Sequence, residues 1–146
     1  MLTVVEKVIF LQNVDVFSEV STEKLAVLAA IATEVEARAG ERLYSEADPS
    51  DAMYLVLDGV VRLHRGETVV TRAREREAFG TWALFDDELR VVSATCEQEA
   101  RLLRIDKGAF IELLADNVEI TQGVLKAVVR RLRSVLSRVG PGAMRG

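Results

Sequence analysis

A glycine and an arginine ten residues apart form the segment of this sequence best suited to binding chemistry. Gly80 precedes one apolar helical turn, and Arg90 lies ten positions later. Glycine lets backbone N–H groups approach an anion, a helix start directs further N–H groups to the same place, and arginine adds a planar charged pair of donors. The segment therefore predicts a binding site for a small anion.

Three acidic residues immediately before Arg90 open a second interpretation of the same segment. Asp86, Asp87 and Glu88 can pair with the arginine, and the loop would then satisfy its own charges and hold no ligand. The acids do not indicate catalysis, because adjacent acids on a turn are usually solvated and no second reactive side chain converges on them. The residues alone leave both interpretations of Arg90 open.

Other reactive side chains are few. The sequence has one histidine and one cysteine, which excludes an internal disulfide and a zinc site built from several histidines. In the alternation of residues 61–64, Val61 and Leu63 point inward, and we predict that His64 is exposed beside Arg62. Cys96 is predicted to be a buried or inert thiol. Motifs of serine hydrolases, zinc peptidases and P-loop triphosphatases are absent, so we predict no enzyme, with no catalytic residue, metal or cofactor.

Length and charge define the setting of this site. The chain has 146 residues, 49% of them hydrophobic, which predicts one domain with a core of its own. Residues 1–119 carry 13 basic and 23 acidic side chains, whereas residues 120–146 carry six basic and no acidic ones. An acidic body repels nucleic acid, so an anionic ligand needs a dedicated pocket. Without an apolar run of about 20 residues or a leader pattern, we expect a cytoplasmic protein with no membrane contact.

Periodicity predicts helices, then short strands, then helices. We expect a first helix over 4–11 and a second one capped by Ser21 that ends near Gly40. Turn compositions separate six predicted strands, and Asp106 and Asn117 are expected to cap two final helices, the longer of which runs to about residue 138 before Gly140. The predicted strands are 42–45, 53–57, 60–64, 69–73, 91–96 and 102–105.

These residues resemble the cyclic-nucleotide-binding domain family, the regulatory module of catabolite activator protein, of cyclic-AMP-dependent kinase regulatory subunits and of nucleotide-gated channels. The resemblance covers residues 11–132 and rests on Asp58-Gly59, Phe79-Gly80 and Arg90 at the family's spacing. It implies an α+β, mainly β fold, an eight-stranded double-stranded β-helix (a jelly-roll-like β-roll) flanked by N-terminal helices and a long C-terminal helix. The expected domain is 1–139, with helices in 1–39, the β-roll in 40–105, helices in 106–139 and a flexible tail at 140–146.

The resemblance also implies a ligand and its site. Residues 80–90 match the family's phosphate-binding cassette, in which backbone amides and the arginine hold the cyclic phosphate of cyclic AMP or cyclic GMP. The expected ligand-binding residues are Gly80, Thr81, Trp82, Ala83, Leu84, Arg90, Val91 and Val92.

Departures from the family pattern weaken that expectation. Thr81 replaces the glutamate that binds the ribose 2′-hydroxyl, and Leu89 and Val91 replace a proline and a hydroxyl residue. A charged hydrogen bond contributes about 1.5–3 kcal/mol against roughly 1 kcal/mol for a neutral one, so a cyclic nucleotide should bind about tenfold more weakly. Ala47 and Arg76 replace glycines, which costs about 1–2 kcal/mol each if φ is positive, or else moves the loops.

Trp82 replaces an aliphatic family residue. It could fill part of the space of a purine or ribose, but ordinary core packing is the favoured interpretation for the only tryptophan.

The last helix carries a second functional signal. Its apolar residues follow alternating spacings of three and four, the pattern of a short coiled-coil seam, at Leu125, Val128, Leu132, Val135 and Val139. In the activators of the family the matching helix forms the subunit interface, so the resemblance implies a homodimer. A helix packed back on its own β-roll is an equal alternative, with its basic residues complementing the helix dipole. The family's transcription factors append a helix-turn-helix after this helix, and only 139–146 remains here, so we expect no DNA-reading domain.

Two functions remain in view. The first is a non-catalytic regulatory or sensory module that binds a cyclic nucleotide weakly, or a different small anion, and responds by moving the helices of residues 107–138 against the β-roll. The alternative is a ligand-free protein-interaction or dimerisation domain that keeps the β-roll as a scaffold.

Overall fold

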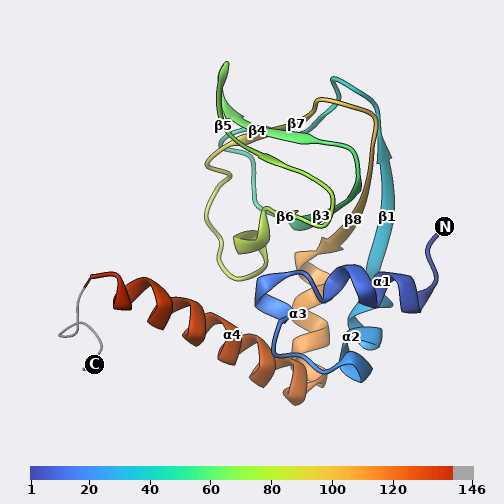
Figure 1. The fold of residues 1–146 in the computed structure, drawn as a ribbon, viewed down its shortest axis with the longest axis vertical. Helices are drawn as coiled ribbons and strands as arrows, with labels where there is room; N and C mark the ends of the chain where they lie inside the picture. Colours follow the sequence, from blue (N-terminus) through green and yellow to red (C-terminus); the bar gives the residue numbers. More distant parts are fainter. Residues whose placement is uncertain (140–146) are drawn as a thin grey trace.

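The computed structural model describes residues 1–139 and consists of a β-roll with helices at one end (Figure 1). Helices α1 (Val4–Leu11) and α2 (Thr22–Ala29) precede the strands, and α3 (Lys107–Asp116) and α4 (Val118–Ser137) follow them. Two short 3₁₀ helices, η1 (Asp15–Phe17) and η2 (Thr81–Leu84), interrupt the loops. The strands are β1 (Ala32–Ala37), β2 (Arg42–Tyr44), β3 (Ala52–Asp58), β4 (Val61–Arg65), β5 (Thr68–Ala73), β6 (Ala78–Phe79), β7 (Ser93–Cys96) and β8 (Ala100–Asp106).

The eight strands among the described residues form two antiparallel sheets of four, in the orders β1-β8-β3-β6 and β2-β7-β4-β5. The chain crosses repeatedly between the sheets, which is how a β-roll places residues distant in sequence side by side. The predicted fold class, an α+β and mainly β jelly-roll-like β-roll with flanking helices, is confirmed.

Two hydrophobic clusters stabilise this arrangement. The first joins the helices to the open end of the roll, and its largest buried members are Leu11, Phe17, Leu28, Phe110 and Ile120. The second fills the roll itself and includes Tyr44, Tyr54, Val56, Phe79 and Leu102. Because β3 is buried from its first residue to its sixth, it contributes to both clusters and anchors the roll to the helices.

The second helix differs from its prediction. Its start is confirmed, because the Ser21 hydroxyl accepts a hydrogen bond from the Lys24 N–H at 3.3 Å. Its predicted end near Gly40 is wrong, since α2 stops at Ala29 and the following residues form β1. β1 pairs along its whole length with β8, in the register from Ala32 opposite Ile105 onward. That pairing joins segments about 70 residues apart, and it overrides the local helical pattern.

The prediction for His64 is also wrong. The side chain is 2% exposed, with Nδ1 2.7 Å from the Gly66 carbonyl oxygen and Nε2 2.7 Å from Thr95 Oγ1. A register shift between Leu63 and His64 interrupts the pairing with β5. The turn after β4 covers this face of the sheet, where the Gly66 N–H donates to a Glu46 carboxylate oxygen. His64 thus occupies an outward-facing position on β4 and is nevertheless buried, because the turn at Gly66 and the loop at Glu46 cover it.

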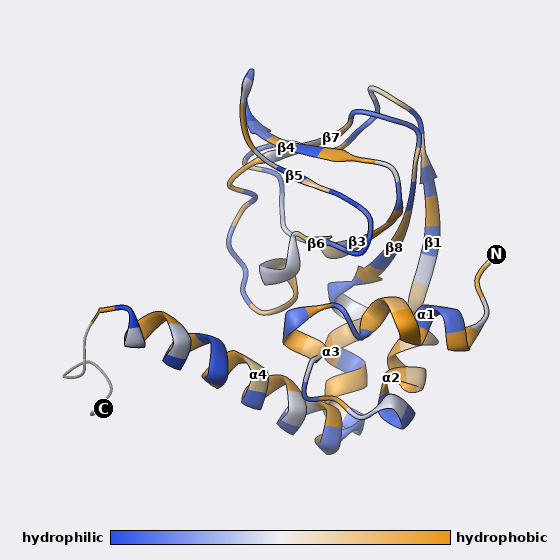
Figure 2. Ribbon diagram, in the orientation of Figure 1, coloured by the Kyte–Doolittle hydropathy of each residue, from blue (hydrophilic) through white to orange (hydrophobic). Residues whose placement is uncertain are grey.

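The first half of helix α4 packs against the rest of the molecule, and the second half projects into solvent. Ile120, Val124 and Ala127 pack against the chain's own core, and beyond them the helix runs away from the roll (Figure 1). Figure 2 shows apolar residues recurring along this projecting part. Of the predicted seam, Val128 packs against the core, whereas Leu125, Leu132, Val135 and Val139 are exposed. The main packing partners of the first half of the helix are α3 and η1, not the strands of the roll.

The predicted stop at Gly140 and the predicted tail at 140–146 lie outside the described residues. Among residues 1–139, no helix combines the length and hydropathy needed to span a membrane.

Candidate ligand-binding site

The start of the predicted cassette is shaped by Gly80. Its φ of 69° lies in the left-handed region, and η2 begins at the next residue. A Cβ at this position would lie 2.7 Å from Nη1 of Arg90, closer than non-bonded atoms approach. Glycine is therefore favoured by the backbone angle, and the packing of the arginine against it leaves no room for a Cβ.

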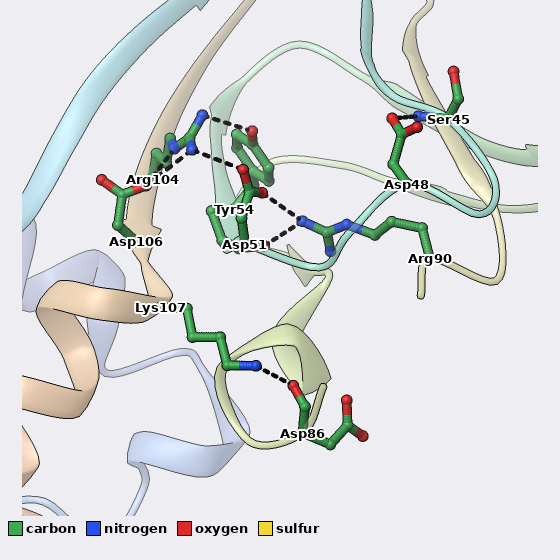
Figure 3. A network of polar contacts seen from close by, with 10 residues as sticks. Ser45, Asp48, Asp51, Tyr54, Asp86, Arg90, Arg104, Asp106 and Lys107 are labelled. Carbon is green, nitrogen blue, oxygen red and sulfur yellow. Dashed lines mark hydrogen bonds and ion pairs between the residues drawn. The ribbon is translucent and has the colours of Figure 1, made fainter. Parts of the chain in front are cut away.

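Arg90 is buried, with 7% of its surface exposed, and its guanidinium is held on two sides. It stacks over the Tyr44 ring at 3.8 Å from the centroid, and Nη2 donates to the Ala52 carbonyl oxygen at 2.6 Å. Figure 3 shows the side chain extended toward Asp51, whose carboxylate oxygen lies 3.5 Å from Nη2. Burial raises the pKa of Tyr44 to about 12, partly opposed by the charge of Arg90, so the phenol stays neutral.

The rest of the guanidinium has unused donors. Nε of Arg90 is buried and has no hydrogen-bond partner, and Nη1 donates to no atom of residues 1–139. A buried donor without a partner costs about 1–3 kcal/mol, and more when the group is charged. The guanidinium therefore has unfilled hydrogen-bonding capacity, and arginine in this state attracts a carboxylate or phosphate. The arginine is therefore prepared to receive an anion.

The acidic neighbours do not occupy Arg90. Asp87 pairs instead with Lys107, the first residue of α3, whose Nζ lies 2.6 Å from the Asp87 carboxylate. Lys107 also donates to the Asp86 carbonyl oxygen (Figure 3). The hydrogen bond and charge of Lys107 hold the pKa of Asp87 below its ordinary value. The self-satisfied loop predicted as an alternative is thus not formed, and the counterion of Arg90 is Asp51.

Asp51 reaches Arg90 from the loop between β2 and β3. Its second carboxylate oxygen lies 3.6 Å from Arg104 Nη2, and Arg104 is held in turn by Asp106 at 2.9 Å and the Tyr54 hydroxyl at 3.3 Å (Figure 3). Sequence reasoning missed Asp51 because its only signal was membership of a turn.

A cavity of about 320 Å³ lies beside the guanidinium. Most of the predicted site residues line it, namely Gly80, Trp82, Ala83, Arg90, Val91 and Val92. Two do not: Leu84 is buried in the core, and Thr81 lines a second cavity next to α4. The lining of the first cavity also includes Asp86, Glu88 and Leu89, which were not predicted as ligand contacts. Tyr44, Ser50 and Leu63 were missed altogether, because only the folding of the roll brings them to the cassette.

Trp82 does not pack in the core, contrary to the favoured interpretation. Its side chain is 56% exposed and lies between the two cavities. The reason is that η2 is a single turn, so when Ala83 and Leu84 face inward the preceding residue must face outward. The indole forms a wall of the cavity and leaves it open.

The two replaced glycines keep a left-handed backbone. Ala47 has a φ of 67° and Arg76 a φ of 71°, so each accepts a cost of about 1–2 kcal/mol. The first loop is tied to the cassette, because the Ala47 N–H donates to the Arg90 carbonyl and the Arg90 N–H donates to the Asp48 carbonyl, both at 2.8 Å. These hydrogen bonds hold the backbone of the arginine at the cavity.

Comparison with known proteins agrees with this geometry. The sequence profile of the cyclic nucleotide-binding domain matches residues 34–117, a range that contains every residue lining the cavity. The chain belongs to the cyclic nucleotide-binding domain family. The crystal structure of the N-terminal domain of a transcriptional regulator from Streptomyces coelicolor A3(2) is similar, with a TM-score of 0.82 and 31% identity, covering 86% of this chain and 94% of that one.

Two curated relatives show the range of proteins that contain such a domain. The chain is 29% identical over 128 residues to a CRP-like cAMP-activated global transcriptional regulator of Mycobacterium tuberculosis, covering 84% of this chain and 57% of the relative. It is 29% identical over 107 residues to a cAMP-dependent protein kinase regulatory subunit of Emericella nidulans, covering 72% of this chain and 26% of the relative. The chain therefore spans about half or less of the length of these relatives.

Proposed function

We propose that residues 1–139 form one non-catalytic sensory module, which binds a small anion through Arg90 and transmits binding to helices α3 and α4. The observation that carries this proposal is the buried guanidinium of Arg90, which lines an open cavity and has hydrogen-bond donors without partners. A charged group left this way in a folded protein is stabilised when an anion completes its hydrogen bonds.

Cyclic AMP and cyclic GMP are the ligands that family membership suggests first. Their cyclic phosphate carries one negative charge, which suits Arg90. The sugar has weaker support, because Thr81, at the position of the family's ribose-binding glutamate, lines the other cavity. We therefore expect cyclic nucleotides to bind at least about tenfold more weakly than a site with that glutamate would hold them.

Isothermal titration calorimetry with both nucleotides tests this proposal. Wild-type protein is compared with Arg90→Gln and with the control Arg72→Gln. Arg72 lies on β5 outside the cavity, and its replacement removes the same charge together with an ion pair to Glu97. Binding in the micromolar range that disappears in Arg90→Gln and persists in Arg72→Gln supports the proposal. Absence of heat with either nucleotide at millimolar concentration removes cyclic nucleotides from consideration.

The path from the cavity to the helices runs through the end of the cassette. Lys107 joins α3 to Asp86 and Asp87, and the Phe85 ring packs edge-on against Phe110 of α3, with centroids 5.7 Å apart. A ligand that moves the cassette must move or break these contacts. α3 and α4 are therefore expected to shift when the site fills.

The output surface that we propose is the exposed face of α4, acting as a homodimer interface. Leu125, Val129, Leu132 and Val135 are each 45–59% exposed on the part that projects from the roll. The middle of the helix is held to the N-terminal segment by the Arg130–Glu19 and Arg131–Asp15 ion pairs, at 2.7 and 2.9 Å. Such an apolar face on a projecting helix buries well against a second copy.

The same apolar face supports the alternative function, a ligand-free dimerisation domain. The two functions separate experimentally. A protein that forms dimers in light scattering and gives no heat with any small anion is the scaffold, whereas Arg90-dependent binding identifies the sensor.

A further inference from the structure

The charges around the cavity limit its ligand to a single negative charge. Arg90 is the one cation among the described residues that line it, and Asp86 and Glu88 line it as well. Asp51 already compensates part of the Arg90 charge from the other edge of the guanidinium. A second negative charge on a ligand would face these carboxylates without a further cation to balance it. Phosphate monoesters and polyphosphates are disfavoured for that reason.

The walls of the cavity are apolar. Leu63 comes from β4, Trp82 from η2, and Leu89, Val91 and Val92 from the segment around the arginine. Trp82, Leu89 and Val91 are more than half exposed, so the molecule leaves large apolar side chains uncovered at this opening. Covering them with an apolar ligand removes that surface from water, at about 25 cal/mol per Å².

Few neutral polar side chains in the same lining can form hydrogen bonds with a sugar or a base. Besides the charged residues, Tyr44 and Ser50 supply the only polar side chains among the described residues that line the cavity. Thr81, at the position of the family's ribose-binding glutamate, lines the other cavity, so a ribose inside this one would lack that charged contact, which lowers affinity. The volume of about 320 Å³ lies near the lower end of the range for small-molecule sites, roughly 300–1,000 Å³.

From one buried arginine, acidic flanks and apolar walls, we infer that the natural ligand class is a compact monocarboxylate with an apolar, ring-bearing body. The carboxylate pairs with the guanidinium of Arg90, and the ring lies against the indole of Trp82 and the side chains of Val91 and Val92. This inference rests on the proposed function, since it names the ligand class of the same site.

The test uses one ring system with three different charges. Calorimetric titrations at pH 7.5 compare 2-naphthoate, the neutral 2-naphthamide and the dianionic 2-naphthyl phosphate, with cyclic AMP and cyclic GMP beside them. We expect 2-naphthoate to bind at least about tenfold more tightly than the amide, the phosphate or either nucleotide. Arg90→Gln abolishes this binding, and Arg72→Gln leaves it unchanged.

A second variant guards against misfolding of the Arg90 variant. Val91 is 69% exposed at the opening, so Val91→Asp should fold normally, and it should weaken 2-naphthoate several-fold by adding a negative charge and removing apolar contact. A nucleotide that binds more tightly than 2-naphthoate in an Arg90-dependent way overturns the inference and leaves the proposed sensor intact. Equal binding of naphthoate and naphthamide overturns the role of Arg90, and absence of binding by every probe removes the sensor and the inference together.

Discussion

Replacing Gly80 by alanine tests the packing that defines the cavity. A Cβ at this residue would lie 2.7 Å from Nη1 of Arg90 and 3.4 Å from the Tyr44 hydroxyl. The guanidinium has little freedom to retreat, because it stacks on the tyrosine ring and donates to the Ala52 carbonyl. We therefore expect Gly80→Ala to displace the charged group, and to abolish anion binding as well as lowering stability.

The size of the effect follows from two contributions. The left-handed backbone costs an alanine about 1–2 kcal/mol, and the steric conflict adds roughly 1–3 kcal/mol. Gly66 supplies a matched control, since its φ is 54° and a Cβ there meets nothing within 4 Å. Gly66→Ala should therefore lose about 1–2 kcal/mol of unfolding free energy and Gly80→Ala about 2–5 kcal/mol. For a domain of this size each kcal/mol corresponds to roughly 2–4 °C in Tm.

Urea unfolding and calorimetric titration measure the two consequences separately. If the conflict is with Arg90, combining Gly80→Ala with Arg90→Gln should recover the part of the lost stability that exceeds the Gly66→Ala value. The reasoning is refuted if Gly80→Ala is no less stable than Gly66→Ala and still binds an anion as the wild type does.

Three further outcomes are expected. Lys107→Met should lower Tm at neutral pH, because it removes the ion pair with Asp87. The pKa of Asp87 in the folded protein lies below its ordinary value of 3.8, so the ion pair stabilises the fold above pH 3.8. The difference in Tm should therefore shrink as the pH falls below 3.8 and the carboxylate becomes protonated. Equal differences at pH 7 and pH 3 would show that the pair is not formed. Leu132→Glu should be monomeric in light scattering at concentrations where the wild type is dimeric. The control Val70→Glu, which changes an exposed apolar residue on β5, should remain dimeric. A dimer in all three proteins contradicts the α4 interface. Trp82, the only tryptophan, should show the red-shifted fluorescence of an exposed indole and shift to the blue when a ligand covers it, and an unchanged spectrum on saturation would place the ligand elsewhere.

Local signals predicted several elements well. The Ser21 cap, the first helix and six of the eight strands depend on short-range patterns of caps, turns and alternation, and the structure has them within a few residues. The two missed strands are different. β6 has two residues, too few for a pattern, and β1 exists because β8 pairs with it across the whole intervening roll.

Errors about single side chains have a common origin. Alternation places His64 on the outer face of its sheet, but it does not show that the turn after β4 will cover that face. Apolar character suggests a buried Trp82, but a single helical turn can direct only some of its residues inward. In both cases exposure is decided by neighbouring segments, about which the residue's own pattern holds no information.

By itself, the sequence predicted the order of helices and strands, the glycine that begins the cassette and the arginine that can hold an anion, because caps, turns and short motifs depend on residues close together in the chain; the roll followed from the family resemblance. Only the tertiary structure decided what surrounds that arginine. Tyr44, Asp51 and Ala52 come from segments at least 38 residues away, and no local pattern specifies which of them will stack, pair or accept. Their arrangement results from the packing of two sheets, and it leaves Arg90 with the unpartnered donor on which the proposed ligand binding rests.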